Sequence, residues 1–399
     1  MKQSVPFLEA IDQAAMTEQT LGWSAVNSGT GNLDGLKTVA GMLADAFAAL
    51  PGDLELVDPA PVTAISADGE EFEKQHGQHL VLRVRPEAER RLVLTGHMDT
   101  VFPVDHPFQA NSWLDDAIVN GPGTADMKGG IAVMLHALMA LERSENGAKL
   151  GYDVMVNSDE ETGSLSSAKL IEKLATGKYA ALTYEPSATP EGTLAHARGG
   201  TGNYSLIVRG RSAHAGRNPQ DGRNALVAAA ALAVGLKELQ TDDCPVNPAK
   251  IEGGAANNVV PDNAVLRFNI RPREPSAGER FEAGLQALMA QVRQAHEVSV
   301  DLHGGVTRRP KPVDRRAQKL FDLVRDCGAE LGQHIDWQST GGVCDGNNIA
   351  ACGVPVVDTM GVRGGKIHSP DEFMIVPSLS ERAALSALVL HRLASGEEL

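Results

Sequence analysis

The segment LVLTGHMDT at 92–100 decides the fold class, because an apolar run ends there in a histidine and an acid. Its first part, LVLTG, is typical of a buried strand. The same rhythm continues along the first half of the chain. We predict strands at 54–57, 80–84, 153–157 and 181–184, and helices at 33–50, 127–143 and 164–175. Strands that alternate with helices predict an α/β layer fold.

From about residue 199 the pattern changes. The predicted order becomes β-α-β-β-α-β, which is typical of a ferredoxin-like unit. Its segments are 203–210, 222–239, 249–252, 264–271, 276–295 and 298–303, and a linker follows at 307–314. The first rhythm then resumes with a helix at 315–332, a strand at 355–359 and a helix at 377–394. We therefore expect one domain formed by 1–198 and 309–399, interrupted by a second domain at 199–308.

Composition excludes several classes of function. The 399 residues include 36 Lys and Arg against 51 Asp and Glu, for a formal net charge of −15. This balance argues against nucleic-acid binding, which needs clustered cations. Four irregularly spaced cysteines make a disulfide framework improbable. No apolar run reaches the length of a membrane span, and the N-terminus lacks a signal-peptide core. We expect a cytoplasmic protein that does not bind membranes.

Histidines and acids follow several predicted strands or lie in glycine-rich turns. They are His97 with Asp99, Asp126, Glu160 with Glu161, Glu185, and His368. Ligands of an open α/β sheet bind at the carboxyl ends of its strands, so these side chains could converge. Two imidazoles and several carboxylates suit Zn²⁺, Co²⁺ or Mn²⁺. A shared carboxylate among them would build a two-metal site.

Each residue alone has a plainer interpretation. His97 and Asp99 fit ordinary loop polarity, Asp126 fits a helix N-cap, and Glu160 with Glu161 fits a solvated acidic turn. Coincidence of the whole set is much less expected. Other catalytic motifs are missing: the sequence has no GxSxG elbow, no HExxH helix and no complete P-loop.

Seven ordered motifs identify a family resemblance. They are GHMDTVFP, GPGTADMKGG, SDEETGS, YEPS, GRSAHAG, GGAANNVVPDNA and GGKIHSPDEF. Together they resemble the dinuclear zinc peptidases and deacylases that include glutamate carboxypeptidase, acetylornithine deacetylase, succinyl-diaminopimelate desuccinylase and aminoacylase. The overall look is most similar to glutamate carboxypeptidase. The resemblance implies a zinc-exopeptidase-like catalytic domain, a mixed sheet flanked by helices, and an inserted ferredoxin-like domain for dimerisation and as a lid.

The resemblance also implies a ligand set for two Zn²⁺ per chain, with Co²⁺ or Mn²⁺ as alternatives. His97 would bind one metal and His368 the other, while Asp126 would bridge both. Glu161 would complete the site of His368, and Glu185 that of His97. Members of this family have a cis peptide after the bridging acid, which here would join Asp126 to Met127.

Three further residues would act in catalysis. Glu160 would be the general base that takes a proton from a metal-bridging water and delivers it to the leaving amine. Asp99 would orient His97. His214, in the GRSAHAG turn, would donate to the oxyanion. In relatives the corresponding histidine enters the partner subunit's site, so a homodimer through the inserted domain is expected.

Substrate contacts are implied at three positions. Arg271 would hold a substrate carboxylate with its planar guanidinium, although a strand-end arginine is the plainer interpretation. Asn258 would lie near the oxyanion or the carboxylate, or would simply be a turn residue. Gly342 belongs to a loop expected to line the substrate pocket. In the same loop Cys344 departs from the serine common in relatives, and we expect it to be a small buried residue.

The resulting function is a metal-dependent amidohydrolase or carboxypeptidase. It would cleave N-acyl amino acids, or a C-terminal amino acid, and would require a free carboxylate. Glu185, where the dipeptidase branch more often has aspartate, favours this branch. An aminopeptidase or dipeptidase on the same scaffold is the alternative. A non-catalytic binding protein is less expected, because every proposed ligand and the proposed base are present.

Overall fold

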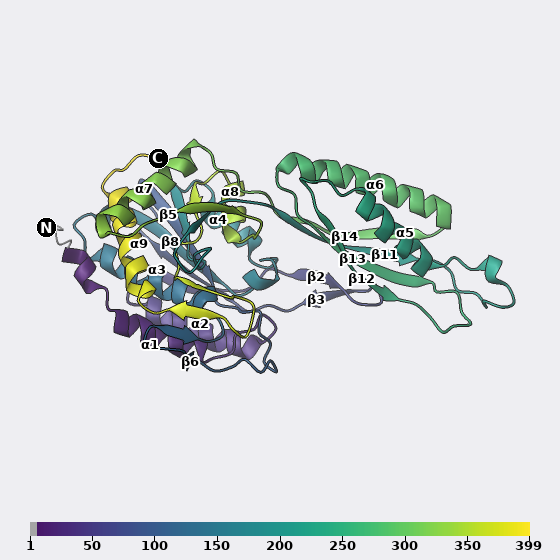
Figure 1. Ribbon diagram of the computed structural model, residues 1–399, viewed down its shortest axis with the longest axis horizontal. Helices are drawn as coiled ribbons and strands as arrows, with labels where there is room; N and C mark the ends of the chain where they lie inside the picture. Colours follow the sequence, from purple (N-terminus) through teal and green to yellow (C-terminus); the bar gives the residue numbers. More distant parts are fainter. Residues whose placement is uncertain (1–5) are drawn as a thin grey trace.

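A computed structural model describes residues 6–399 and shows two lobes (Figure 1). The larger lobe contains both the first and the last of the described residues, Pro6 and Leu399. The smaller lobe is formed by a four-stranded sheet and two helices from the middle of the sequence. The predicted fold class is therefore confirmed: an α/β domain with a mixed sheet is interrupted by an inserted α+β unit.

The larger lobe is built on a six-stranded mixed sheet. In spatial order its strands are β1 (Asp53–Val57), β4 (His79–Val84), β8 (Leu150–Asn157), β5 (Arg90–His97), β9 (Ala180–Thr183) and β16 (Val356–Val357). β5 is parallel to both β8 and β9, and β9 is parallel to β16. The carboxyl ends of these four strands consequently meet at one edge of the sheet.

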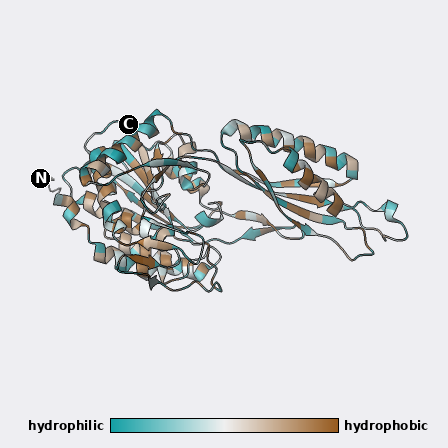
Figure 2. Ribbon diagram, in the orientation of Figure 1, coloured by the Kyte–Doolittle hydropathy of each residue, from teal (hydrophilic) through white to brown (hydrophobic). Residues whose placement is uncertain are grey.

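Helices cover both faces of this sheet. One side is packed by α1 (Gln13–Ser24), α2 (Leu33–Phe47), α3 (Gly129–Glu142), α7 (Arg315–Leu331) and α9 (Ser378–Ala394); the other is packed by α4 (Ala168–Ala175) and α8 (Asp345–Ala351). Leu80 and Leu82 face the first layer, whereas Val81 faces the second. A strand buried on both faces needs apolar residues at successive positions, which explains the continuous apolar runs. Figure 2 shows brown, hydrophobic segments in both lobes.

The inserted unit has its own core. Its antiparallel sheet has the order β12 (Val246–Gly253), β13 (Asn263–Ile270), β11 (Thr201–Arg209) and β14 (Ser299–Arg308). Helices α5 (Ala225–Glu238) and α6 (Pro275–His296) pack on one face. This is the predicted β-α-β-β-α-β order. The expected linker starts later than predicted, because β14 pairs with β11 as far as Arg308. We propose domain boundaries at 199 and 308 on this basis.

A hairpin that the sequence analysis missed connects the two lobes. It consists of β2 (Val62–Ile65) and β3 (Glu71–Lys74), and it extends from the larger lobe to the helix-free face of the inserted sheet (Figure 1). Ile65 packs there against Ile207 and Val265. Arg267 donates from Nη2 to the backbone oxygens of Ile65 and Ser66 at 2.7 and 3.0 Å. Four of the eight positions in these two short strands are charged or polar, so the hairpin carries little apolar signal in the sequence.

Small elements complete the larger lobe. A second sheet joins β17 (Gly364–Gly365), β18 (Phe373–Ile375), β7 (Ile118–Asn120) and β6 (Ser112–Trp113), and a third pairs β10 (Leu194–Arg198) with β15 (Trp337–Thr340). The four cysteines are free thiols. Within residues 6–399, no helix combines the length and the apolar character needed to cross a membrane.

Candidate metal centre

Strand ends position one half of the candidate site. His97 is the last residue of β5, and its Cα pairs in register with that of Asn157 at the end of β8. Directly after β8, the single turn η4 (Glu160–Thr162) carries Glu160 and Glu161. Glu185 follows β9 by two residues and places an oxygen 3.7 Å from Nε2 of His97. The parallel register of β5, β8 and β9 therefore brings these predicted residues to one edge.

Two loops supply the other half. Asp126 lies in the turn η2 (Thr124–Lys128) before α3, and the peptide bond from Asp126 to Met127 is cis. His368 lies in the loop between β17 and β18. The two carboxylate oxygens of Asp126 face different imidazoles: Oδ1 is 3.1 Å from Nε2 of His97, and Oδ2 is 3.3 Å from Nε2 of His368. Glu161 also approaches Nε2 of His368, at 3.1 Å.

The electrostatics of this cluster require positive charge. Burial and the neighbouring carboxylates raise the pKa of Glu161 to about 8, and burial raises that of Glu185 to about 8. Burial also favours the protonated form of Asp126, but hydrogen bonds with His368 and His97 lower its pKa below the ordinary range. Hydrogen bonds to Asp126 and Glu161 raise the pKa of His368 to about 11. Several acids are thus buried close together, which is unfavourable unless cations balance their charge.

Divalent cations fit this donor set. Ligand atoms of His97, Glu160 and Glu185 lie within 4.8 Å of one another, as do those of His97, Asp126 and Glu161. Imidazole nitrogens with carboxylate oxygens are the donors that zinc and similar ions prefer. The carboxylate of Asp126 faces both histidines, which is the position that a bridging ligand requires. The sequence-predicted ligands therefore lie together in a chemically suitable arrangement.

Asp99 lies behind these residues and is fully buried. Nδ1 of His97 is 3.4 Å from its carboxylate and 3.0 Å from its backbone oxygen. The same carboxylate accepts hydrogen bonds from the backbone N–H groups of Glu160 and Glu161 at 3.1 and 3.2 Å, and from the hydroxyl of Thr30 at 2.6 Å. Asp99 consequently fixes the ring of His97 and the turn that carries both glutamates.

A cavity of about 670 Å³ opens beside the acidic cluster. Asp126, Glu160, Glu161, Glu185 and His368 form its floor, and the predicted pocket residue Gly342 lies in its wall. Three other predicted residues are not brought to this cavity within one chain: His214, Asn258 and Arg271 are exposed residues of the inserted unit. Arg271 donates instead to the side chain of Asn269 at 2.8 Å.

His214 and Asn258 lie close to each other. His214 forms a β-bridge with Val259, and the backbone oxygen of Asn258 accepts from Ala215. The loop that follows His214 contains η5 (Pro219–Asp221), the small teal helix at the tip of the inserted lobe in Figure 1. The single chain therefore presents these two predicted residues as one surface, away from its own acidic cluster.

Sequence reasoning missed three charged residues around the site. Arg308 lies within ion-pair distance of Glu160. Glu372 accepts hydrogen bonds from the backbone N–H groups of Gly123, Ala125 and Asp126. Glu372 therefore holds the loop that carries Asp126. Arg198 lies in the cavity wall. Glu372 stands four residues after the predicted His368, which was a usable signal. Arg308 fell in the expected linker and gave none.

Cys344 is buried, as expected, and it has a local structural role. It is the N-cap of α8, where its sulfur accepts from the backbone N–H of Gly346 at 3.3 Å. Burial raises the pKa of this thiol well above its ordinary value. A neutral capping thiol explains how cysteine can occupy this position.

A buried ion-pair group supports the cavity wall and leads to a stability prediction. Asp358 accepts two hydrogen bonds from Arg198, at 2.7 and 3.0 Å, and lies 2.9 Å from Nζ of Lys311. Asp358→Asn leaves two buried cations without a counter-charge, so the free energy of unfolding should fall by about 3–5 kcal/mol. Equilibrium unfolding in urea measures this free energy. Asp336→Asn, at an exposed pair with His334, is the control and should change little.

The same group gives the sign of a pH effect. Burial alone would raise the pKa of Asp358, but Arg198 and Lys311 lower it below the ordinary value. A carboxylate whose pKa is lower in the folded state stabilises the protein above its unfolded pKa of about 4, and this contribution is lost as the pH falls further. The acid-induced loss of stability should therefore be shallower for Asp358→Asn than for the natural chain.

Comparisons with known proteins agree with this geometry. The model of peptidase family M20/M25/M40 matches residues 93–392. Carboxypeptidase G2 of a Pseudomonas species is 29% identical over 332 residues, which cover 80% of this chain and 78% of that protein. Succinyl-diaminopimelate desuccinylase of Xanthomonas oryzae is 28% identical over 326 residues, 76% and 83% of the two chains.

Solved structures share the fold at lower identity. A tripeptidase of Staphylococcus aureus superposes with a TM-score of 0.73 at 22% identity, covering 97% of this chain and all of that one. A metallo-carboxypeptidase of Sulfolobus solfataricus gives a TM-score of 0.71 at 15% identity, with 96% and 100% covered.

Proposed function

Because this chain belongs to peptidase family M20/M25/M40, we propose that it is a two-metal amidohydrolase that releases an amino acid bearing a free carboxylate. The family makes it a hydrolase of the metallopeptidase class. The finer assignment is that it removes a C-terminal amino acid, or the acyl group of an N-acyl amino acid. The similarity to carboxypeptidase G2 and to a desuccinylase supports this branch.

One observation carries the proposal: Asp126 faces His97 with one carboxylate oxygen and His368 with the other. We assign His97, Glu185 and Asp126 to one Zn²⁺, and His368, Glu161 and Asp126 to the second. Bound divalent ions polarise an amide carbonyl and make a water molecule more acidic. Co²⁺ and Mn²⁺ fit the same donors.

Glu160 is the proposed general base and acid. Its carboxylate is buried at the cavity floor next to the proposed ligand Glu161. Burial raises the pKa of Glu160 to about 7, which suits a group that takes up a proton from water and then donates it to the leaving amine near neutrality. Asp99 keeps this turn and the His97 ring in place through the contacts described above.

Substrate binding is assigned to residues of both lobes. Gly342 and the neighbouring cavity wall would receive the substrate, and Arg271 would pair with its carboxylate. We propose that the chain forms a homodimer through the inserted unit. His214 and Asn258, exposed on that unit, would then reach the partner's cavity, where His214 donates to the oxyanion. A molar mass in solution equal to one chain would contradict this assembly.

A cytoplasmic location stays a prediction from the sequence.

Paired substrates test the assignment. We expect the zinc-loaded protein to hydrolyse N-acyl amino acids, and to lose most of this activity on the matching amino-acid amides, which lack the carboxylate. Detection of the amine that hydrolysis releases measures the rates on both the acids and the amides. Equal rates on acid and amide would contradict the carboxylate requirement.

An aminopeptidase or dipeptidase is the alternative on the same scaffold, and the tripeptidase likeness fits it. Such an enzyme must recognise a free α-amine. A dipeptide and its N-acetylated form separate the two assignments: a carboxypeptidase or deacylase accepts the acetylated form, whereas an aminopeptidase accepts only the free dipeptide.

A further inference from the structure

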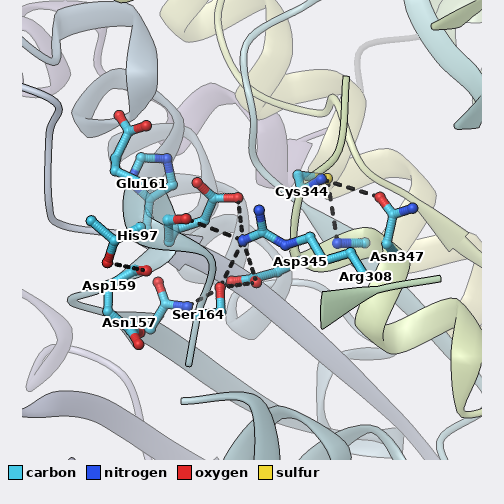
Figure 3. A network of polar contacts seen from close by, with 12 residues as sticks. His97, Asn157, Asp159, Glu161, Ser164, Arg308, Cys344, Asp345 and Asn347 are labelled. Carbon is cyan, nitrogen blue, oxygen red and sulfur yellow. Dashed lines mark hydrogen bonds and ion pairs between the residues drawn. The ribbon is translucent and has the colours of Figure 1, made fainter. Parts of the chain in front are cut away.

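Arg308 lies where the chain leaves the inserted unit. It is the last residue of β14, and its Cα pairs with that of Thr201 at the start of β11. Its side chain is nevertheless only 5% exposed, because it extends away from the inserted sheet into the larger lobe. Figure 3 shows Arg308 directed toward Ser164 and Asp345, with dashed lines that converge on its guanidinium.

A single nitrogen, Nη2, makes the contacts of this guanidinium to the larger lobe. It lies 2.7 Å from the carboxylate of Glu160 and donates to the backbone oxygen of the same residue at 3.1 Å. It also donates to the hydroxyl of Ser164 at 2.8 Å and lies 3.4 Å from Asp345. The side chain and the backbone of Glu160 are thus held by the same cation.

Asp345, one of the groups beside this guanidinium, is itself held by other residues of the larger lobe. Asp345 is the first residue of α8, and its carboxylate also accepts from Asn157 at 2.6 Å and from Ser164. Asn157 ends β8, the strand that leads to Glu160. The guanidinium therefore joins the end of a central strand, the turn of the proposed base and the start of a helix, all in one buried network.

We propose that Arg308 is a positioning residue for Glu160, so that the placement of the base depends on how the inserted unit is seated on the larger lobe. This inference rests on the proposed function. A glutamate has three side-chain torsions, and a base must lie within hydrogen-bond reach of the proton it takes. Arg308 selects one placement of that carboxylate and comes from the unit proposed as the lid. Closure of the lid and readiness of the base would thereby be linked.

Two other roles for Arg308 predict different results. A direct contact with the substrate carboxylate would raise KM and would affect acids more than amides. A purely structural role would lower stability and metal content, and the remaining folded enzyme would turn over normally. A positioning role lowers kcat on every substrate and leaves KM and metal binding close to those of the natural chain.

Arg308→Met and Arg308→Lys form the test. We expect Arg308→Met to bind two zinc ions per chain with unchanged affinity, to keep KM within about threefold and to lose about 10²-fold in kcat, the scale of a misplaced catalytic group. Arg308→Lys keeps the charge and should recover part of kcat. Arg309→Met removes the same charge at the next, exposed residue and is the matched control, with activity unchanged.

Each outcome decides between these roles. A raised KM with kcat intact, or a loss confined to carboxylate substrates, overturns the positioning role in favour of substrate binding. Loss of zinc, or a kcat that becomes normal once corrected for the folded fraction, overturns it in favour of structure. If Arg308→Met does not fold, Arg308→Lys decides by the same measurements. Failure of the proposed function itself would appear separately, as full activity in Glu160→Gln.

Discussion

Glu160→Gln should lower kcat by about 10²–10⁴-fold while the protein still binds two metal ions. The substitution keeps the size of the side chain, but it removes the ability to accept and return a proton together with the negative charge that faces Arg308. Activity on an N-acyl amino acid and zinc content by elemental analysis are the two measurements. More than a tenth of the natural kcat in this variant would show that Glu160 is not the base.

The neighbouring residue provides the matched control. Glu161→Gln makes the same chemical change one position along the same turn, but Glu161 approaches His368 and is assigned as a metal ligand. We expect this variant to lose metal together with activity, and to regain some activity at high zinc concentration. Glu160→Gln should not respond to added zinc. The opposite pattern would exchange the two assignments.

Asp126→Asn should abolish tight binding of both metals. The carboxylate of Asp126 faces both imidazoles, so its charge is needed on each side. Loss of a residue that only orients a metal ligand typically lowers metal affinity by about 10–100-fold. We expect Asp126→Asn to lower zinc affinity by more than this, and hydrolysis to fall to background. A zinc titration followed by calorimetry measures both sites.

Asp99→Asn is the control for this second experiment, because Asp99 contacts His97 and the glutamate turn but does not face His368. Its loss should cost about 10–100-fold in affinity and leave two sites that fill at higher zinc. Two intact tight sites in Asp126→Asn would contradict the bridging assignment.

The sequence predicted the layered fold well because the signal was strong and local. The apolar runs that became β4, β5 and β8 are buried on both faces, and the order of segments in the inserted unit is the order observed. The convergence of His97, Glu160, Glu161 and Glu185 was predictable too, since residues that follow parallel strands share one edge.

The remaining features depend on contacts between segments that are distant in the chain. Arg308 follows an exposed strand pattern and is buried only because another lobe packs around it. Glu372 holds the Asp126 loop from more than 240 positions away. The opposite holds for His214 and Asn258. The family resemblance implies a role for them at the cavity, but in a single chain they lie exposed and away from it.

The hairpin formed by β2 and β3 limits how this protein can be divided. In sequence, residues 199–308 look like a cassette that could be excised or exchanged between relatives. In space, Ile65 from outside that range covers Ile207 and Val265, and Arg267 is hydrogen-bonded to the hairpin backbone. An excised cassette would expose this apolar contact, and a transplanted one would meet an ill-matched hairpin. Exchange experiments should therefore move 62–74 together with the insert, as a unit that is discontinuous in sequence.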